Sequence, residues 1–184
     1  MIDAGRIQAA VTELISAIGE DPSRPELAAT PVKVAEAYQG FFAGIDQDPL
    51  AVLADTFEAE HNDVVILKDI EFISICEHHL LPFTGVTHLA YLPDNRVVGL
   101  GRLPKLVEVL ACRPQLQENL TAQIADSLEA GLGTKGVVVV IEARHQCVAS
   151  RGARQPEVQT VTMATRGCYS EPAARAEVMG LISK

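Results

Sequence analysis

The sequence is poor in aromatic residues, in long apolar runs and in positive charge. Aromatic residues make up 4% of its 184 residues, and tryptophan is absent. No apolar run is long enough to span a bilayer, and the first six residues lead into an amphipathic stretch instead of a secretory signal. Internal repeats and low-complexity segments are also missing, and the length suits one domain. We therefore expect a cytoplasmic protein with no membrane partner.

Acidic residues outnumber basic ones by 24 to 15, which gives a formal net charge of −9. This balance argues against a general surface for nucleic acid or anionic membranes. It still allows a small basic pocket that binds an anion.

Hydrophobic spacing divides the chain into a helical N-terminal segment, residues 1–60, and a strand-rich region, residues 61–184, within one structural domain. In the first segment, Thr30 and Pro31 predict the N-cap and first turn of a helix. Residues 49–57 predict another, shorter helix.

Alternating or continuous β-favouring residues predict strands at 64–75, 86–92, 96–100, 158–165 and from 137 towards Cys147. Further helices are predicted at 104–112, 115–132 and 171–182. Because neighbouring strands are separated by few residues, we expect an α+β fold with an antiparallel sheet backed by helices.

The most informative motif is Cys-Glu-His-His at residues 76–79, followed much later by His-Gln-Cys at residues 145–147. Cys76, His79 and Cys147 would give a zinc ion three ligands and leave its fourth position open, as catalytic zinc sites do.

Two histidines flank these ligands. His78 and His145 can move protons near neutral pH. On the predicted strand His145 and Cys147 are two residues apart, so their side chains would project from the same face.

The spacing alone does not establish a metal site, because it is not that of a zinc finger. The same residues could belong to the core, or the four cysteines could pair as disulfides. A reducing cytoplasm favours a metal or free thiols. Two thiolates and an imidazole suit zinc, although iron(II) or cobalt would fit the same ligands.

Five motifs follow one another along the chain: Gly-Glu-Asp-Pro at 19–22, Thr-Pro at 30–31, Cys-Glu-His-His at 76–79, Arg-Pro-Gln-Leu-Gln-Glu at 113–118 and His-Gln-Cys at 145–147. With them the chain resembles the GTP cyclohydrolase I family over nearly its whole length. The resemblance implies a tunnelling fold, in which subunits join their sheets into a barrel with helices outside. It also implies a homo-oligomer, typically a decamer.

The activity implied by the resemblance is the opening of the guanine imidazole ring of GTP. C8 leaves as formate, and 7,8-dihydroneopterin triphosphate forms. By motif, Cys76, His79 and Cys147 match the zinc ligands, and His78 and His145 match the acid/base histidines. Zinc can make water a nucleophile for C8, and an imidazolium can protonate N7. His78 could instead orient a ligand.

Gln117 and Glu118 match the base-recognition positions of the family. A carboxylate can accept hydrogen bonds from N1–H and the 2-amino group of guanine, which adenine cannot supply. Without the family match, Glu118 would be read as a solvated residue of an amphipathic helix.

The expected triphosphate site departs from the family pattern. Lys33 stands where arginine is usual, and residues 101–105, Gly-Arg-Leu-Pro-Lys, replace Ser-Lys-x-x-Arg. Arg102 and Lys105 thus exchange places with the usual lysine and arginine, whereas Arg151 is kept. Arginine can grip phosphate through two hydrogen bonds while lysine acts as a point charge, so the binding geometry is expected to change.

These observations leave three functions open. The first is a zinc-dependent GTP cyclohydrolase. The second is a related enzyme for a different guanine nucleotide in a specialised pterin or deazapurine pathway, and the third is a non-catalytic zinc-binding relative. An architectural zinc site needs neither His78 nor His145, which argues against the third.

Four residues have no place in this scheme. Cys112 is expected to be a small buried helix residue, and Cys168 is expected to be exposed. His61 and His88 have no predicted role.

Overall fold

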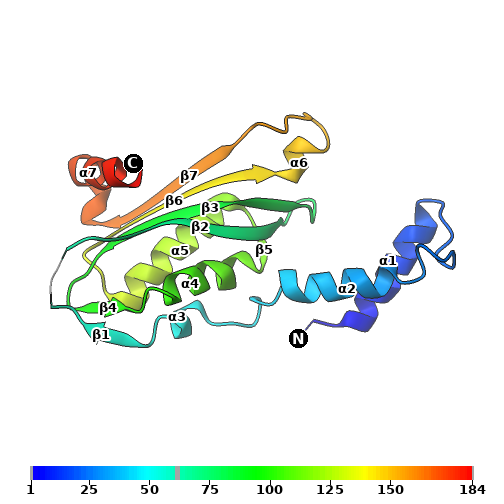
Figure 1. The fold of residues 1–184 in the computed structure, drawn as a ribbon, viewed down its shortest axis with the longest axis horizontal. Coiled ribbons are helices and arrows are strands. Elements are labelled where there is room, and N and C mark those ends of the chain that lie inside the picture. Colours follow the sequence, from blue (N-terminus) through cyan, green and yellow to red (C-terminus); the bar gives the residue numbers. More distant parts are fainter. Residues whose placement is uncertain (1, 61–62, 184) are drawn as a thin grey trace.

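The computed structural model describes residues 2–60 and 63–183 and shows an α+β fold in which helices cover a sheet (Figure 1). The helices are α1 (Ala4–Ala17), α2 (Thr30–Phe41), α3 (Pro49–Val52), α4 (Arg102–Ala111), α5 (Gln117–Leu132), α6 (Gln146–Ala149) and α7 (Pro172–Ile182), with a 3-10 turn, η1 (Cys168–Ser170). The strands are β1 (Thr56–Glu58), β2 (Val65–Cys76), β3 (Pro82–Leu92), β4 (Arg96–Val98), β5 (Pro114–Gln115), β6 (Gly136–His145) and β7 (Thr160–Gly167). Within the described ranges, no helix has the length and apolar character needed to cross a membrane.

The main sheet has the strand order β5-β2-β3-β6-β7, and β1 pairs with β4 in a separate two-stranded sheet. β2, β3, β6 and β7 are antiparallel, but β5 runs parallel to the end of β2. The prediction of a wholly antiparallel sheet is therefore wrong at this edge. Parallel neighbours need a crossover connection, and α4 supplies it. Gln115, predicted to begin a helix, lies in β5 instead.

α4 and α5 cover one face of the sheet, and α7 lies against part of the other face (Figure 1). The apolar run of β6 is buried on both sides for this reason. Val137, Val139 and Ile141 join the large core beneath the helices. Val138 and Val140 join a smaller core with residues of α7. A strand buried on both faces reads as a continuous apolar run, as the sequence predicts.

The N-terminal helices α1 and α2 pack against each other and extend beyond the sheet (Figure 1). Asp3 caps α1, since its carboxylate accepts a hydrogen bond from the N–H of Arg6 at 3.0 Å. The prediction of Thr30 as an N-cap is wrong by one position, because α2 already includes Thr30. Ala29 precedes the helix and provides no side-chain cap.

The predicted helix at residues 49–57 is also wrong in its second half. Only Pro49–Val52 is helical, with Asp48 accepting from the N–H of Leu50 at 2.9 Å. Thr56–Glu58 instead pairs with Arg96–Val98. Strand pairing with a segment far along the chain here prevails over local preference.

Gly85→Ala is expected to destabilise the fold, because β3 and β6 approach each other closely at this glycine. An added Cβ would lie 2.0 Å from the carbonyl oxygen of Glu142 and 2.7 Å from Cα of Ala143. Backbone atoms cannot swing aside as a flexible side chain can, and such overpacking costs about 1–3 kcal/mol. Thermal unfolding measures the loss.

Gly180→Ala in α7 is the matched control, because a Cβ there meets nothing within 4 Å and alanine favours a helix over glycine. Its Tm should equal or exceed that of the unmodified chain. Equal Tm values for the two variants would contradict the close approach of the strands.

Candidate active site

The pairing register between β3 and β6 brings the two predicted metal motifs together. Phe83 pairs with His145, so the end of β6 lies beside the start of β3. The turn before β3, residues 77–81, therefore lies next to the residues that follow β6.

That turn presents Cys76 and His79. The N–H of Leu80 donates to the carbonyl oxygen of Cys76 at 2.8 Å, and the N–H of Cys76 donates to the carbonyl oxygen of Leu81 at 2.9 Å. Leu80 has a φ of 52°, a left-handed conformation that side chains rarely adopt. The N–H of Glu77 donates to the carbonyl oxygen of Gln115, which ties the turn to β5. Backbone strain of this kind is typical of functional sites.

Cys147 reaches the same place from α6. Because β6 ends at His145 and Cys147 belongs to a helical turn, the prediction that both project from one face of a strand is wrong. The backbone N–H and the hydroxyl of Ser150 close this turn by donating to the carbonyl oxygen of Gln146, at 2.9 and 2.6 Å. The ligand atoms of Cys76, His79 and Cys147 all lie within 4.8 Å of one another.

The donor set of this group suits zinc, since it offers two thiols and one imidazole. Burial raises the pKa of Cys147, and the neighbouring Cys76 raises it further. A cation between the two sulfurs would counter both effects by stabilising the thiolates. All four cysteines are free, so the alternative in which they pair as disulfides is wrong. In the described part of the chain no fourth metal-binding side chain joins the group, so a tetrahedral ion held there would keep one position for water or substrate.

The ring of His145 is held on two sides. It stacks on Phe83, with ring centroids 4.5 Å apart and 7° between the planes. Its Nε2 lies 2.8 Å from Oε1 of Gln117. Burial lowers the pKa of His145, and the carboxylate of Glu118 acts in the opposite direction. The ring is therefore mostly neutral at pH 7.

Gln117 is buried at the start of α5. Its Nε2 donates to the carbonyl oxygens of Ile141 and Thr160, both at 3.0 Å, and to Oγ1 of Thr162 at 3.1 Å. The side chain thus bonds within the chain, and its predicted contact with guanine stays a prediction.

Glu118 and His78 are exposed beside the metal group. Glu118 lies in the first turn of α5, near enough to influence the charge of His145. The ring of His78 meets that of His79 edge to face, with centroids 6.3 Å apart. Both side chains are accessible to a substrate, and their predicted roles stay predictions.

Of the four predicted phosphate ligands, Arg151 adjoins the metal group. Its Nη1 lies 2.6 Å from Nε2 of His79. Arg151 is exposed, so its charge is available to an anion that approaches the group.

Arg102 and Lys105 lie at the opposite end of α4 from the metal group. Ala111, the last residue of α4, accepts a hydrogen bond from Ser74 near the end of β2 at 2.7 Å. Arg102 is about 13 Å further along the helix axis. It forms an ion pair with Asp55 beside a cavity of about 450 Å³.

Lys105 pairs with Glu108 at 2.9 Å. Lys33 is exposed on α2, in the helical arm beyond the sheet (Figure 1). One copy of the chain therefore does not gather the four cations around the metal group.

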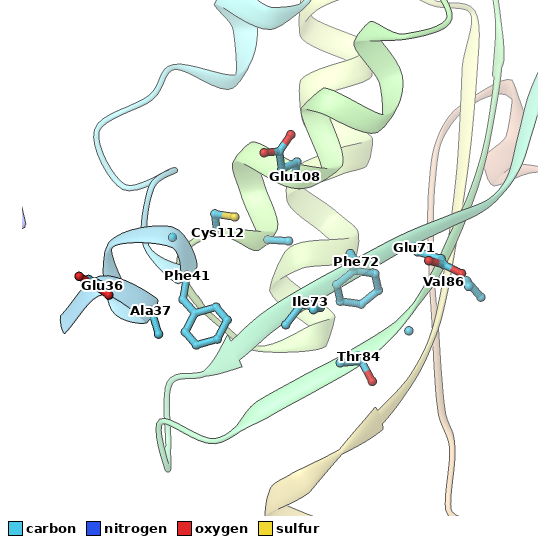
Figure 2. Close-up of a pocket in the computed structure, with 13 residues that line it drawn as sticks. Glu36, Ala37, Phe41, Glu71, Phe72, Ile73, Thr84, Val86, Glu108 and Cys112 are labelled. Carbon is cyan, nitrogen blue, oxygen red and sulfur yellow. The ribbon is translucent and has the colours of Figure 1, made fainter. Parts of the chain in front are cut away.

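A larger cavity, of about 890 Å³, lies between α2, β2, β3 and α4 (Figure 2). Its lining is mainly apolar and includes Phe41, Phe72 and Cys112, but none of the predicted site residues. Cys112 is only partly buried, because the cavity leaves its side unfilled, so the prediction of a buried residue is wrong. Burial nevertheless raises its pKa, and the Glu108 carboxylate adds to the effect.

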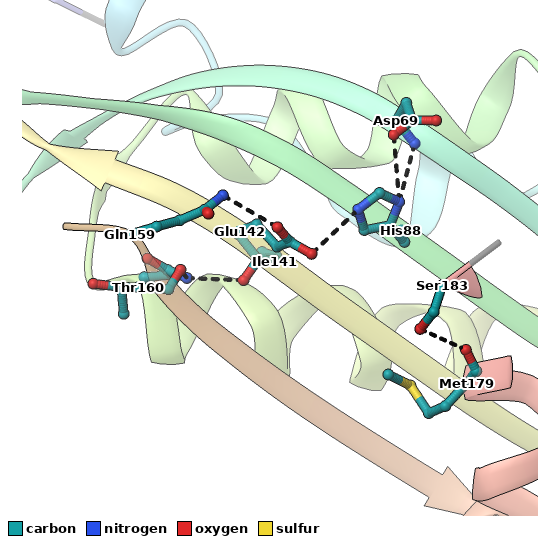
Figure 3. Close-up of polar contacts among 9 residues, drawn as sticks. Asp69, His88, Ile141, Glu142, Gln159, Thr160, Met179 and Ser183 are labelled. Atoms are coloured by element: carbon teal, nitrogen blue, oxygen red, sulfur yellow. Dashed lines mark hydrogen bonds and ion pairs between the residues drawn. The ribbon is translucent and has the colours of Figure 1, made fainter. Parts of the chain in front are cut away.

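Polar contacts account for the buried position of His88. It is buried in β3 between Asp69 and Glu142 (Figure 3). Its Nδ1 accepts a hydrogen bond from the N–H of Asp69 at 3.2 Å, and its Nε2 lies 4.0 Å from the Glu142 carboxylate. Asp69, with a φ of 57°, lies in the irregularity of β2 that this bond supports.

Cys168 and His61 are the other two residues without a predicted role. Cys168 is exposed, as expected. His61 lies outside the described residues.

Phe83, Thr162 and Asp55 contact predicted site residues but were missed from the sequence. Phe83 follows the first metal motif closely, and a strand register would have paired it with His145. No spacing rule links Thr162 to Gln117 or Asp55 to Arg102, because those contacts depend on how distant segments pack.

Comparisons with known proteins show the family of the chain. The family model described as GTP cyclohydrolase I matches residues 7–183. GTP cyclohydrolase 1 of Leifsonia xyli subsp. xyli is 56% identical over 182 residues, which cover 98% of this chain and 95% of that protein. The proteins of the same name from Streptomyces griseus and Desulforamulus reducens are each 50% identical. The first match covers 98% of this chain and 90% of the relative, and the second covers 100% of both. Matches over so much of its length show that the chain is an enzyme that belongs to the GTP cyclohydrolase I family.

Proposed function

We propose that this enzyme uses zinc to hydrolyse the guanine imidazole ring of GTP, releasing C8 as formate and forming 7,8-dihydroneopterin triphosphate. The observation that carries the proposal is the grouping of Cys76, His79 and Cys147 within 4.8 Å. It occurs in a chain that is about half identical to enzymes named GTP cyclohydrolase 1.

Cys76, His79 and Cys147 would hold the ion, and bound zinc supplies Lewis acidity that makes water a nucleophile near neutral pH. His145, stacked and hydrogen-bonded in one orientation, takes up a proton while neutral and then passes it to N7 of the base. His78, exposed in the turn beside His79, is the second residue that moves protons.

Glu118 recognises the guanine base. Its exposed carboxylate accepts hydrogen bonds from N1–H and the 2-amino group. Adenine presents no donors at these positions, so it would leave the carboxylate unpaired and would be rejected.

A neighbouring subunit completes the site in a tunnelling-fold homo-oligomer, which we propose to be a decamer. Lys33, Arg102 and Lys105 lie away from Arg151 within one chain, so a second chain is needed to place more cations near the metal group. β7 is an edge strand with Val161 and Met163 exposed by 59% and 49%, as expected of a face that another sheet covers. Sedimentation equilibrium measures the number of subunits, and a monomer would contradict this arrangement.

The experiment that tests the function measures formate and pterin formation from GTP by purified, zinc-reconstituted protein. Equal amounts of formate and pterin are expected. Intact GTP beside stoichiometrically bound zinc would exclude GTP as the substrate.

A different guanine nucleotide is a second candidate, favoured by the changed phosphate residues Lys33, Arg102 and Lys105. Rates with GTP, GDP, GMP and 8-substituted guanosines in competition would decide between the two. A clear preference for GTP would end the second candidate.

Asp55→Asn is expected to lower KM for GTP by roughly two- to fivefold, because it releases Arg102 for phosphate. The side chains of Arg102 and Asp55 are 47% and 74% exposed, and exposed ion pairs contribute about 0–1 kcal/mol. Steady-state kinetics at low salt measure the change, with kcat unaffected.

Glu20→Gln is the matched control, since it removes the carboxylate of another exposed pair, with Arg24 at 3.1 Å. It should leave KM unchanged. A raised KM in Asp55→Asn would contradict the assignment of Arg102 to the phosphates.

A further inference from the structure

We propose that the side chain of Gln117 is a positioning residue that holds His145 in one tautomer, with the proton on Nε2 and the lone pair on Nδ1. The inference rests on the proposed role of His145 in proton transfer. It gives the side chain of Gln117 a task other than contact with guanine.

The orientation of the Gln117 amide follows from its partners. Nε2 lies 3.0 Å from the carbonyl oxygens of Ile141 and Thr160, which belong to the neighbouring strands β6 and β7 (Figure 3). Carbonyl oxygens only accept hydrogen bonds, so the amide must present its NH₂ group to them. A flipped amide would place oxygen against two buried carbonyl oxygens. Oε1 therefore faces His145.

Two threonine hydroxyls support the same orientation. Oγ1 of Thr121 donates to the carbonyl oxygen of Gln117 at 2.7 Å and lies 2.6 Å from Oγ1 of Thr162. Since the one proton of Thr121 is used, Thr162 must donate to Thr121 and can accept from Nε2 of Gln117 at 3.1 Å. The hydrogen bonds thus run in one consistent direction.

The tautomer of His145 follows from the amide. Oε1 of Gln117 can only accept, so the Nε2 of His145 at 2.8 Å must carry a proton. In the neutral ring the other nitrogen, Nδ1, then holds the lone pair. No described residue hydrogen-bonds Nδ1, and it is not among the fully buried polar atoms that lack a partner. It is therefore not fully buried and remains without a partner among the described residues.

Stacking on Phe83 fixes the plane of the ring, and Gln117 fixes which nitrogen is free. Without the Gln117 acceptor a neutral imidazole would divide between two tautomers, and only one of them has its lone pair on Nδ1. Efficient proton transfer needs the reacting nitrogen in place, so the loss should appear in kcat and not in KM.

Neutron diffraction from deuterium-exchanged crystals of the zinc-loaded, unmodified protein tests the tautomer directly. Deuterium on Nε2 of His145 is expected. A ring that carries deuterium on Nδ1 and none on Nε2 would overturn the proposal without the need for any variant.

Gln117→Met keeps the length of the side chain and removes the acceptor. We expect kcat for GTP to fall roughly 10- to 100-fold, with KM within about twofold. Gln117→Glu should recover part of kcat, because a buried, protonated glutamic acid can donate to a carbonyl and still accept from His145. A raised KM with unchanged kcat in both variants would instead show a guanine contact and overturn the proposal.

Thr162→Val is the matched control, because it removes one acceptor of Nε2 and leaves the two carbonyl oxygens that orient the amide. It should lose much less of kcat than Gln117→Met. An equal loss would show a packing effect and overturn the proposal. Thermal unfolding shows whether Gln117→Met is folded. If it is not, the tautomer in the unmodified protein and the comparison of kcat between Gln117→Glu and Thr162→Val test whether Gln117 positions His145. If the unmodified enzyme released no formate, the proposed function would fail, while the neutron result would still test the tautomer.

Discussion

Cys147→Ser is expected to abolish both zinc binding and formate release from GTP. The change leaves Cys76 and His79 as the two remaining ligands of the group, and a serine hydroxyl does not ionise as a thiol does. The hydrogen bonds that close α6 come from Ser150 and Gln146, so the backbone of the site should persist. Metal analysis of the purified protein and a formate assay measure the two losses.

Cys168→Ser is the control for this variant, because it makes the same chemical change at an exposed thiol outside the metal group. It should keep full metal content and activity. Cys147→Ser protein with one zinc per chain and normal formate release would show that the ligand assignment is wrong.

His145→Ala is expected to lower kcat for GTP by about 10²–10⁴-fold, the usual contribution of a positioned acid or base. Zinc content should not change, because His145 is not one of the three ligand residues. Burial lowers the pKa of His145 from its ordinary 6.5. The limb of the kcat/KM–pH profile that reports this residue in the free enzyme should therefore lie below pH 6.5 and disappear in the variant.

His78→Ala gives the comparison for His145→Ala. If His78 only orients a ligand, its loss should reduce zinc affinity more than kcat at saturating zinc. Unchanged kcat in both variants, with zinc bound, would remove the two histidines from the mechanism.

Local patterns of hydrophobic and β-favouring residues predicted much of the secondary structure. The run of valines in β6 predicted a buried strand, and the structure covers that strand on both faces. Local patterns failed at Thr56–Glu58, where pairing with β4 prevails, and at Gln115, which joins β2 after a crossover. In these places a partner distant in the sequence decides the conformation.

The motifs predicted only part of the candidate site. The motifs around Cys76 and Cys147 predicted which side chains belong together, and the structure brings their ligand atoms within 4.8 Å. The motifs did not predict that Cys147 lies on a helical turn. Nor did they predict the hydrogen bond between Gln117 and His145 or the ion pair between Asp55 and Arg102.

The sequence by itself determined the ligand types, the order of the motifs along the chain and the family. Residue identity and near-neighbour spacing carry that information, and both are visible without a fold. Tertiary structure decided the register that places Phe83 beside His145 and the hydrogen bonds that orient the Gln117 amide. Those contacts join residues far apart in the chain, and they form because each buried polar group must find a partner once the sheet and helices have packed.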